Sequence, residues 1–113
     1  MANPLVPWPP SDNDLYWLAG LLEGEGSFTQ LSKEPGVPVI SLGMTDEDIV
    51  ARAANLMKVS YHTIPLPSGK SRYQFMIKGR PRAGRIMSTL YPLMGERRKT
   101  QIVAALKFAE DQS

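Results

Sequence analysis

Hydrophobic positions along the 113-residue chain follow two spacings, and each spacing predicts a different kind of element. Where apolar residues recur every three or four positions, they share one side of a helix at about 100° per residue. Leu15, Leu18 and Leu22 follow this pattern, and Ser11 or Asp12 can cap the helix. We expect helices over residues 12–24, 45–58, 79–91 and 96–110, with Thr45 as the cap of the second. The helix over 45–58 should bury Ile49, Ala53, Leu56 and Met57. The helix over 79–91 should bury Ala83, Ile86, Met87 and Leu90, and the helix over 96–110 should bury Ile102, Val103, Leu106 and Ala109.

Between these helices apolar and polar residues alternate one by one, which is typical of strands with one buried face. We expect strands over 26–33, 37–44, 59–64 and 71–78, paired as two hairpins that turn at 34–36 and 65–70. The inward residues of the second and fourth strands are Ile40, Leu42 and Met44, and Tyr73, Phe75 and Ile77. Burial of Phe28 in the first strand would also bury Gln30, a conflict that a bulge would resolve. The pattern predicts an α+β protein.

The first helix has a second side that carries almost no side-chain bulk. Tyr16, Gly20 and Gly24 fall opposite the leucines, with Trp17 beside them. Two glycines four residues apart leave a flat strip where another backbone can approach closely, which indicates a partner helix, most simply a copy of itself. The alternative is an ordinary buried helix that ends in a glycine-rich cap.

Two carboxylates end this helix, where the helix dipole is negative and acids are disfavoured. Glu23 and Glu25 stand there among glycines, in a stretch that reads Leu-Ala-Gly-Leu-Leu-Glu-Gly-Glu-Gly over 18–26, followed by Ser-Phe. We therefore expect a positive charge beside these two carboxylates, and a divalent cation that prefers oxygen ligands would supply it.

The stretch 18–26 resembles the signature of the LAGLIDADG homing endonucleases, with glutamate at both acidic positions of the nominal motif. The resemblance implies an αββαββα fold with a C-terminal helix, whose antiparallel sheets form a saddle along DNA. Because the chain holds one motif, the resemblance implies a homodimer joined through Tyr16, Trp17, Gly20 and Gly24. It also implies Mg²⁺-dependent hydrolysis of both strands of a long, partly palindromic site in double-stranded DNA, as in intron or intein mobility.

The same resemblance assigns roles to particular residues. Glu25 and the carbonyl of Gly24 would bind Mg²⁺, and Asp46 would lie close to the active centre. Arg97 or Arg98 would be the basic residue beside it, and the choice between the two stays open.

Composition adds a charge asymmetry to this picture. Residues 1–48 carry eight acids and one base, whereas residues 49–113 carry twelve bases and three acids, which gives net charges of −7 and +9. A basic surface that meets a polyanion is consistent with this distribution. The expected DNA contacts, on the outward strand positions and the basic segments that follow, are Thr29, Lys33, Ser41, Arg72, Gln74, Lys78, Arg80, Arg82 and Lys99.

Other classes of function are excluded by residues that are missing. The chain has no cysteine, which removes thiolate metal sites and cysteine nucleophiles, and its single histidine, His62, is expected to be a surface or packing residue. We expect no organic cofactor. No apolar run reaches the length of a membrane span and no secretory leader is visible, so a cytoplasmic or nucleoid-associated location without membrane contact is expected.

Two other readings remain open. The first is a relative that binds DNA or RNA without cleaving it, such as a maturase or a transcription factor. The second is an unrelated soluble dimer held by the glycine strip. Residues 1–11 carry four prolines and are expected to form an extended arm, pinned by Trp8, before a single domain over 12–113.

Overall fold

The computed structural model describes residues 8–108 of the chain. It contains helices, strands and short irregular turns in the expected order of helix, two strands, helix, two strands and helices. The elements are α1 (Asp12–Glu25), β1 (Ser27–Leu31), β2 (Glu34–Met44), α2 (Glu47–Met57), β3 (His62–Pro65), β4 (Ser71–Lys78), a π-helical turn η1 (Arg80–Gly84), α3 (Arg85–Leu90), a 3₁₀ turn η2 (Tyr91–Leu93) and α4 (Glu96–Ala105).

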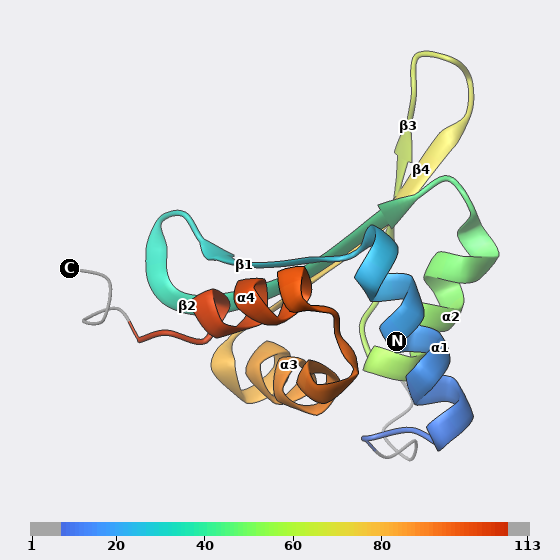
Figure 1. Ribbon diagram of the computed structural model, residues 1–113. Coiled ribbons are helices and arrows are strands. Elements are labelled where there is room, and N and C mark those ends of the chain that lie inside the picture. The colour runs from blue at the N-terminus through green and yellow to red at the C-terminus, as the bar shows by residue number, and fades with distance from the viewer. Residues whose placement is uncertain (1–7, 109–113) are drawn as a thin grey trace.

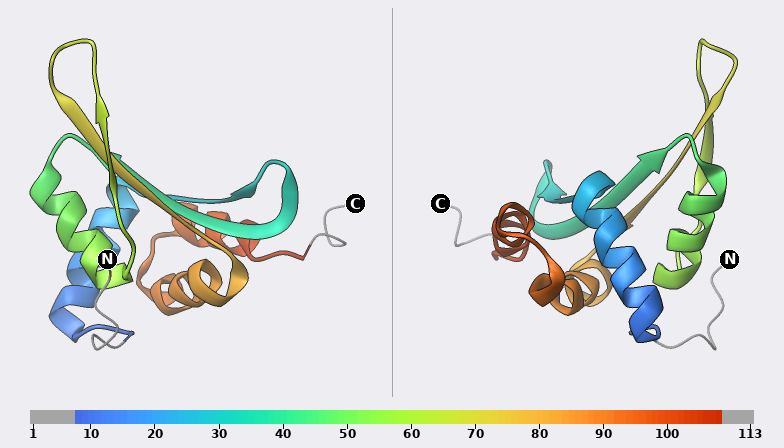
Figure 2. Two further views of the ribbon diagram at one scale, coloured as in Figure 1. Left: turned by 180° about the vertical axis from the view of Figure 1, so that it is seen from behind. Right: turned by 45° about the vertical axis from the view of Figure 1, so that its right-hand side comes forward.

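The strands form one antiparallel sheet in the order β1-β2-β4-β3. All the helices pack on one side of this sheet (Figure 1). The β1–β2 turn and the β3–β4 hairpin rise from the two ends of the sheet on its other side, so that this outer face is curved like a saddle (Figures 1 and 2). None of the helices in the described part of the chain covers it.

The core lies between the inner face of the sheet and the helices. Phe28, Ile40 and Phe75 from the strands pack in one cluster with Leu18 and Leu22 of α1. Leu18, Leu22 and Ile40 are fully buried, as the helical and alternating patterns predict. The inner face therefore holds α1 firmly under the sheet, and the outer face is left for other contacts.

The first hairpin departs from the predicted boundaries. Its turn lies at residues 32–33, and β2 begins at Glu34, so the predicted turn at 34–36 is wrong. The register shifts only after Gln30, between Gln30 and Leu31, so Gln30 stays on the same face as Phe28 and a bulge does not resolve the conflict. The Gln30 amide donates to the carbonyl of Ala105 at 2.9 Å, and its oxygen accepts from the amide of Gly36 at 3.0 Å.

Two helices bury partly different residues from those predicted. In α2, Val50 and Ala54 are buried and Ile49 is half-buried, and the cap position is Asp46, with no side-chain cap from Thr45. In α4, Val103 is 50% exposed, whereas Arg98 and Ala105 point inward with Ile102. The predicted burial of Ala109 lies outside the described residues.

The segment after β4 is less regular than the single helix expected there. It is divided into η1, α3 and η2, although Ala83, Ile86, Met87 and Leu90 are buried as predicted. Trp8 anchors the start of the described chain here, because its indole nitrogen donates to the Thr89 hydroxyl at 3.1 Å. Residues 1–7 of the expected arm over 1–11 lie outside the described part.

Candidate nucleic-acid interface

Glu25 is the last residue of α1, at the point where the helix meets the sheet. Ser11 caps the start of the helix, and at its end the amide of Gly26 bonds to the Leu22 carbonyl at 3.0 Å. A Cβ on Gly26 would lie 2.7 Å from Leu22 Cδ2, so only glycine allows the chain to pass this closely from α1 into β1. This tight exit fixes exposed Glu25 beside the outer face of the sheet.

Glu23 is held in a different environment from Glu25. Its carboxylate oxygen Oε1 accepts a hydrogen bond from the Gly95 amide at 2.7 Å, at the start of α4. Its backbone carbonyl accepts from Arg98 Nε at 2.8 Å. The negative end of α1 thus meets the positive end of α4, and the position that looked unfavourable for an acid is stabilised within the subunit.

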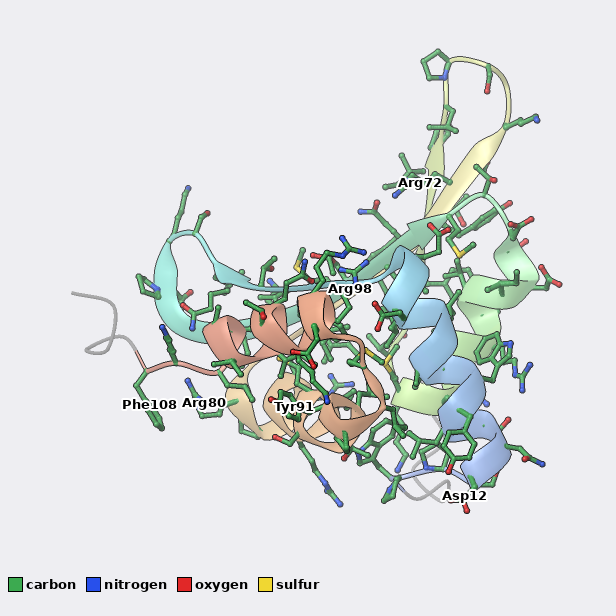
Figure 3. All side chains as sticks on the ribbon, viewed as in Figure 1. Asp12, Arg72, Arg80, Tyr91, Arg98 and Phe108 are labelled. Carbon is green, nitrogen blue, oxygen red and sulfur yellow. The ribbon has the colours of Figure 1, made fainter. Side chains whose placement is uncertain are left out.

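The basic start of α4 separates into three different environments. Arg98 is buried, with 6% exposure, and its Nη1 also donates to Gln101 Oε1 at 2.8 Å. Lys99 Nζ lies 5.4 Å from the centre of the ring of Tyr91, which is on the helical side of the molecule (Figure 3). Arg97 alone of the three is exposed. The three cations at the start of α4 thus have different surroundings, and the guanidinium of Arg98 is held by the Glu23 carbonyl and by Gln101.

The outer face of the sheet is polar and its side chains come from all four strands. Strand pairing aligns Ser27 with Ser41 and Ser41 with Met76, and it aligns Gly43 with Gln74 and Gln74 with His62. Of the predicted DNA contacts, this face gathers Thr29, Ser41, Arg72, Gln74 and Lys78. Lys33 is exposed in the β1–β2 turn.

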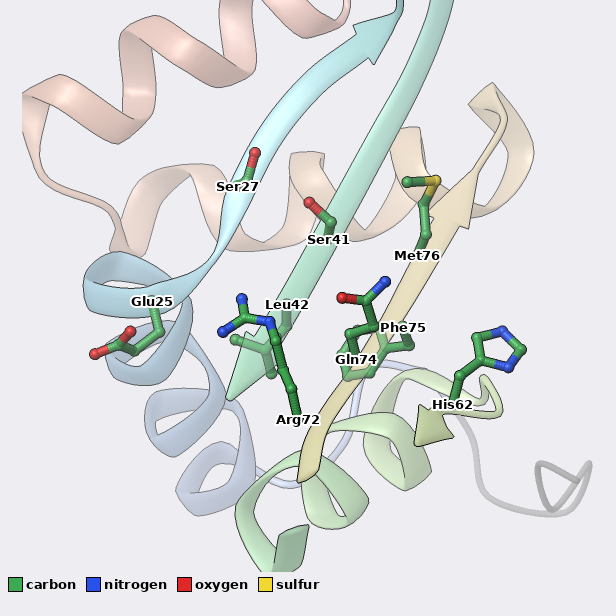
Figure 4. A pocket seen from close by; sticks show the side chains of 10 residues that line it. Glu25, Ser27, Ser41, Leu42, His62, Arg72, Gln74, Phe75 and Met76 are labelled. Atoms are coloured by element: carbon green, nitrogen blue, oxygen red, sulfur yellow. The ribbon is translucent and has the colours of Figure 1, made fainter. Parts of the chain in front are cut away.

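A hollow of about 310 Å³ lies on this face beside Glu25 (Figure 4). Its wall includes the carboxylate of Glu25, the guanidinium of Arg72, the amide of Gln74 and the imidazole of His62. The Arg72 side chain points in the direction of Glu25 (Figure 4). A Cβ on Gly43 would lie 2.5 Å from Arg72 Nη2, so the absence of a side chain there makes room for the guanidinium.

Two predicted DNA contacts are instead engaged by the ends of helices. Arg80 donates to the carbonyl of Leu106 at 2.8 Å and lies 4.1 Å from the centre of the Phe108 ring (Figure 3). Arg82 donates to the carbonyl of Lys58 at the end of α2, at 2.6 Å. Both guanidiniums thus satisfy helix C-termini on the helical side of the sheet.

Of the four predicted catalytic residues, Glu25 lines the hollow, whereas Arg97 and Arg98 of α4 do not. Asp46 is exposed at the start of α2, and it does not line the hollow.

The glycine strip of α1 is open in the subunit. No atom lies within 4 Å of a Cβ built on Gly20 or on Gly24, and Tyr16 is 61% exposed. Trp17 is half-buried, and the Arg52 guanidinium stacks over its ring at 3.9 Å. Tyr16, Gly20 and Gly24 therefore form one uncovered surface that leads to Glu25, whereas Trp17 beside them is partly covered by Arg52.

His62 and Met76 belong to the outer face, although the sequence reading did not select them. A turn at 65–70 would pair residue 64 with 71 and therefore His62 with inward-facing Tyr73. The structure instead pairs Pro65 with Ser71 and Ile64 with Arg72, so His62 is opposite outward-facing Gln74. A shift of one residue moves a strand's side chains to the opposite face. Met76 could have been found from its alternation with Phe75 and Ile77, because it shares a face with Gln74.

The described residues do not gather a full set of side-chain ligands for a cation. Among residues 8–108, no group of three or more histidine, cysteine, aspartate or glutamate side chains is placed to hold a metal ion. Glu25 offers a hard oxygen donor of the kind that Mg²⁺ and Ca²⁺ prefer. Glu25 is exposed at the end of α1.

No protein-family model and no curated protein matches the sequence. Solved structures match the fold. The I-CvuI homing endonuclease, in complex with a DNA target in 2 mM Mg with the DNA not cleaved, has a TM-score of 0.61 and 16% identity over 85% of this chain. The DNA complex of I-CeuI, a group I intron-encoded homing endonuclease, has a TM-score of 0.57 and 14% identity over 82% of this chain. DNA-bound I-LtrWI, a LAGLIDADG homing endonuclease, has a TM-score of 0.54 and 14% identity over 77% of this chain.

These neighbours confirm that the chain has the LAGLIDADG homing endonuclease fold predicted from residues 18–26. The chain spans 67% of I-CvuI, about half of I-CeuI and a third of I-LtrWI. Within the described residues no helix is both long and apolar enough to cross a membrane.

Proposed function

We propose that the protein is a site-specific DNA endonuclease that acts as a homodimer and hydrolyses phosphodiester bonds with the help of a divalent cation. The observation that carries this proposal is the position of Glu25. It is an exposed carboxylate at the junction of an uncovered glycine-faced helix and a saddle-shaped polar sheet. The structural neighbours are homing endonucleases solved with DNA, and I-CvuI was solved with Mg or Ca present.

Pairing of two α1 helices would give this surface its symmetry. Gly20 and Gly24 let two helix backbones approach, and Tyr16 and Trp17 extend the contact along the helix. Two copies of Glu25 then converge at the floor of a continuous saddle. Two half-sites of a partly palindromic DNA duplex would match that two-fold arrangement, since a symmetric dimer presents the same surface twice.

In this proposal the chain's own residues hold the DNA and position the reacting phosphate. Glu25 and the carbonyl of Gly24 would hold Mg²⁺, which supplies Lewis-acid stabilisation of the charge that develops on the phosphate. Arg97 is the exposed arginine at the start of α4, so we assign to it, rather than to Arg98, the role of the basic residue beside the centre. Asp46 stays a secondary candidate.

The outer face would contact the major groove. Arg72 and Gln74 carry the side chains that bind guanine and adenine edges through paired hydrogen bonds. Lys78 and Lys33 would contact phosphates, together with polar Thr29 and Ser41. Arg80, Arg82 and Lys99 are not carried into this role, because their cationic groups lie against helix ends or an aromatic ring.

The test begins with selection of a preferred site from a random DNA library, because the target is unknown. A supercoiled plasmid that carries the selected site is then incubated with the protein in Mg²⁺ or in a chelator. We expect linear product only with Mg²⁺, and binding that falls steeply with salt.

A protein that binds its selected DNA in Mg²⁺ without nicking it would refute the nuclease and support a catalytically inactive binding relative. Failure to select any DNA, with a stable dimer, would instead support a dimer unrelated to nucleic acid. A selection from RNA that outcompetes DNA would point to a maturase-like role.

A further inference from the structure

Met76 is a large apolar side chain exposed on the outer face of the sheet, which also carries exposed Ile64 among mostly polar residues. Met76 is 49% exposed, and it lies on the outer side of β4 between Gln74 and Lys78. Across the sheet it is aligned with Ser41 and then with Ser27, which are both small. On its other side β3 begins at His62, opposite Gln74, so no residue of β3 is paired with Met76. Figure 4 shows its side chain standing clear of the sheet.

A single exposed apolar residue is ordinary on a protein surface. This one, however, stands at the wall of the hollow that also contains Glu25 and Arg72, on the surface proposed to meet the major groove. The groove edges of the bases carry hydrogen-bonding groups and one apolar group, the 5-methyl group of thymine. The chemistry that matches an uncovered thioether chain among polar readers is therefore that methyl group.

Resting on the proposed function, we infer that Met76 is a specificity-determining residue that selects thymine in each half-site through contact with its methyl group. Gln74 precedes it by two residues on the same face, which separates the two side chains by about 7 Å along the strand. Base pairs are stacked about 3.4 Å apart. The thymine therefore lies one or two base pairs from the base that Gln74 contacts, which is adenine when both hydrogen bonds of the amide are used.

The chain offers a matched control on the same hairpin. Ile64 is the other large apolar residue exposed on this face of the sheet, at 36%, and it is paired with Arg72 near the tip. Met76→Ala and Ile64→Ala both remove an exposed apolar side chain from the outer face. Met76→Leu keeps an apolar group of similar volume. Because Met76 is half-exposed, its substitution should leave the thermal unfolding midpoint unchanged, which verifies that the variant is folded.

The experiment measures binding to the selected site and to copies in which each thymine in turn is replaced by deoxyuridine. Deoxyuridine lacks only the methyl group. We expect one thymine per half-site whose replacement lowers the affinity of the wild-type protein for the DNA about fourfold, which is the effect of one buried methyl group. The same replacement should change the affinity of Met76→Ala less than twofold, whereas Met76→Leu and Ile64→Ala should keep the wild-type response.

Three results would overturn the inference while leaving the proposed function intact. In the first, no replacement of thymine by deoxyuridine changes the affinity of the wild-type protein. In the second, Met76→Ala loses as much affinity as the wild-type protein on the same replacement. In the third, the loss of affinity disappears in Ile64→Ala instead of in Met76→Ala. A protein that selects no DNA sequence at all would overturn the proposed function, and the inference with it.

Discussion

Arg97 and Arg98 are neighbours in sequence that should behave as two different kinds of residue. Arg98 is 6% exposed and donates to the Glu23 carbonyl and to Gln101 Oε1, both at 2.8 Å. Arg97 is exposed to solvent. Replacing each by alanine should therefore separate a residue that fixes the end of α1 from one that is free to meet DNA.

The magnitude follows from the contacts that Arg98 loses. A hydrogen bond from a charged donor contributes about 1.5–3 kcal/mol, and the Glu23 carbonyl at the end of α1 is left without its partner. Part of the lost hydrogen-bond free energy is regained where water reaches the vacated space and bonds to the carbonyl. We expect Arg98→Ala to lower the free energy of unfolding by about 2–4 kcal/mol, and Arg97→Ala by less than about 0.5 kcal/mol, the range of ordinary surface changes.

Urea denaturation of the two variants at one protein concentration is the appropriate assay, since dimer formation makes stability concentration-dependent. With a slope of about 2 kcal/mol per M, the midpoint for Arg98→Ala should fall by about 1–2 M. Arg97→Ala should keep its midpoint and lose cleavage rate. Equal midpoints for the two variants would refute the assignment of Arg98 to the α1–α4 contact.

Three further predictions concern the dimer, the hollow and a surface ion pair. Gly20→Leu fills the open strip of α1 and should give monomers in sedimentation; an unchanged dimer mass would exclude this surface as the interface. Gly43→Val puts atoms where the Arg72 guanidinium lies, so both Gly43→Val and Arg72→Ala should relax the selected sequence at the same base pair, and a full preference in Gly43→Val would contradict this. The hydrogen bond from Arg52 holds the pKa of Asp14 below its usual value. The ion pair therefore stabilises the folded protein above about pH 3.9, and this stabilisation is lost as the pH falls through the lowered pKa. An NMR titration should show that Arg52→Gln raises this pKa, and an unchanged value would remove Arg52 as its cause.

Much of the fold was predictable because its elements have strong local signals. The leucine stripe of α1, the capping Ser11 and the alternation in β4 each gave the correct element, and the bounds of β4 are as predicted. The motif over 18–26 identified the fold, which the structural neighbours confirm. These features depend on residues near one another in sequence, so the pattern alone contains them.

The errors arose where tertiary contacts decide. A hydrophobic stripe cannot reveal that Arg98 points inward, because its inward position depends on a carbonyl of another helix. The same limit applies to Glu23, whose carboxylate is satisfied by the Gly95 amide, 72 residues further along the chain. The face on which His62 lies depends on one residue of register in the second hairpin, and the predicted turn at 65–70 begins one residue too early.

The central claim is that Glu25, and not its acidic neighbour Glu23, is the indispensable carboxylate. The decisive measurement is the single-turnover cleavage rate of the selected DNA in Mg²⁺ by Glu25→Gln and by Glu23→Gln, each under conditions that bind all the DNA. We predict that Glu25→Gln binds DNA normally and cleaves at least about 100-fold more slowly. Glu23→Gln keeps an oxygen for the Gly95 amide and should stay close to the wild-type rate. Unimpaired cleavage by Glu25→Gln would contradict the account.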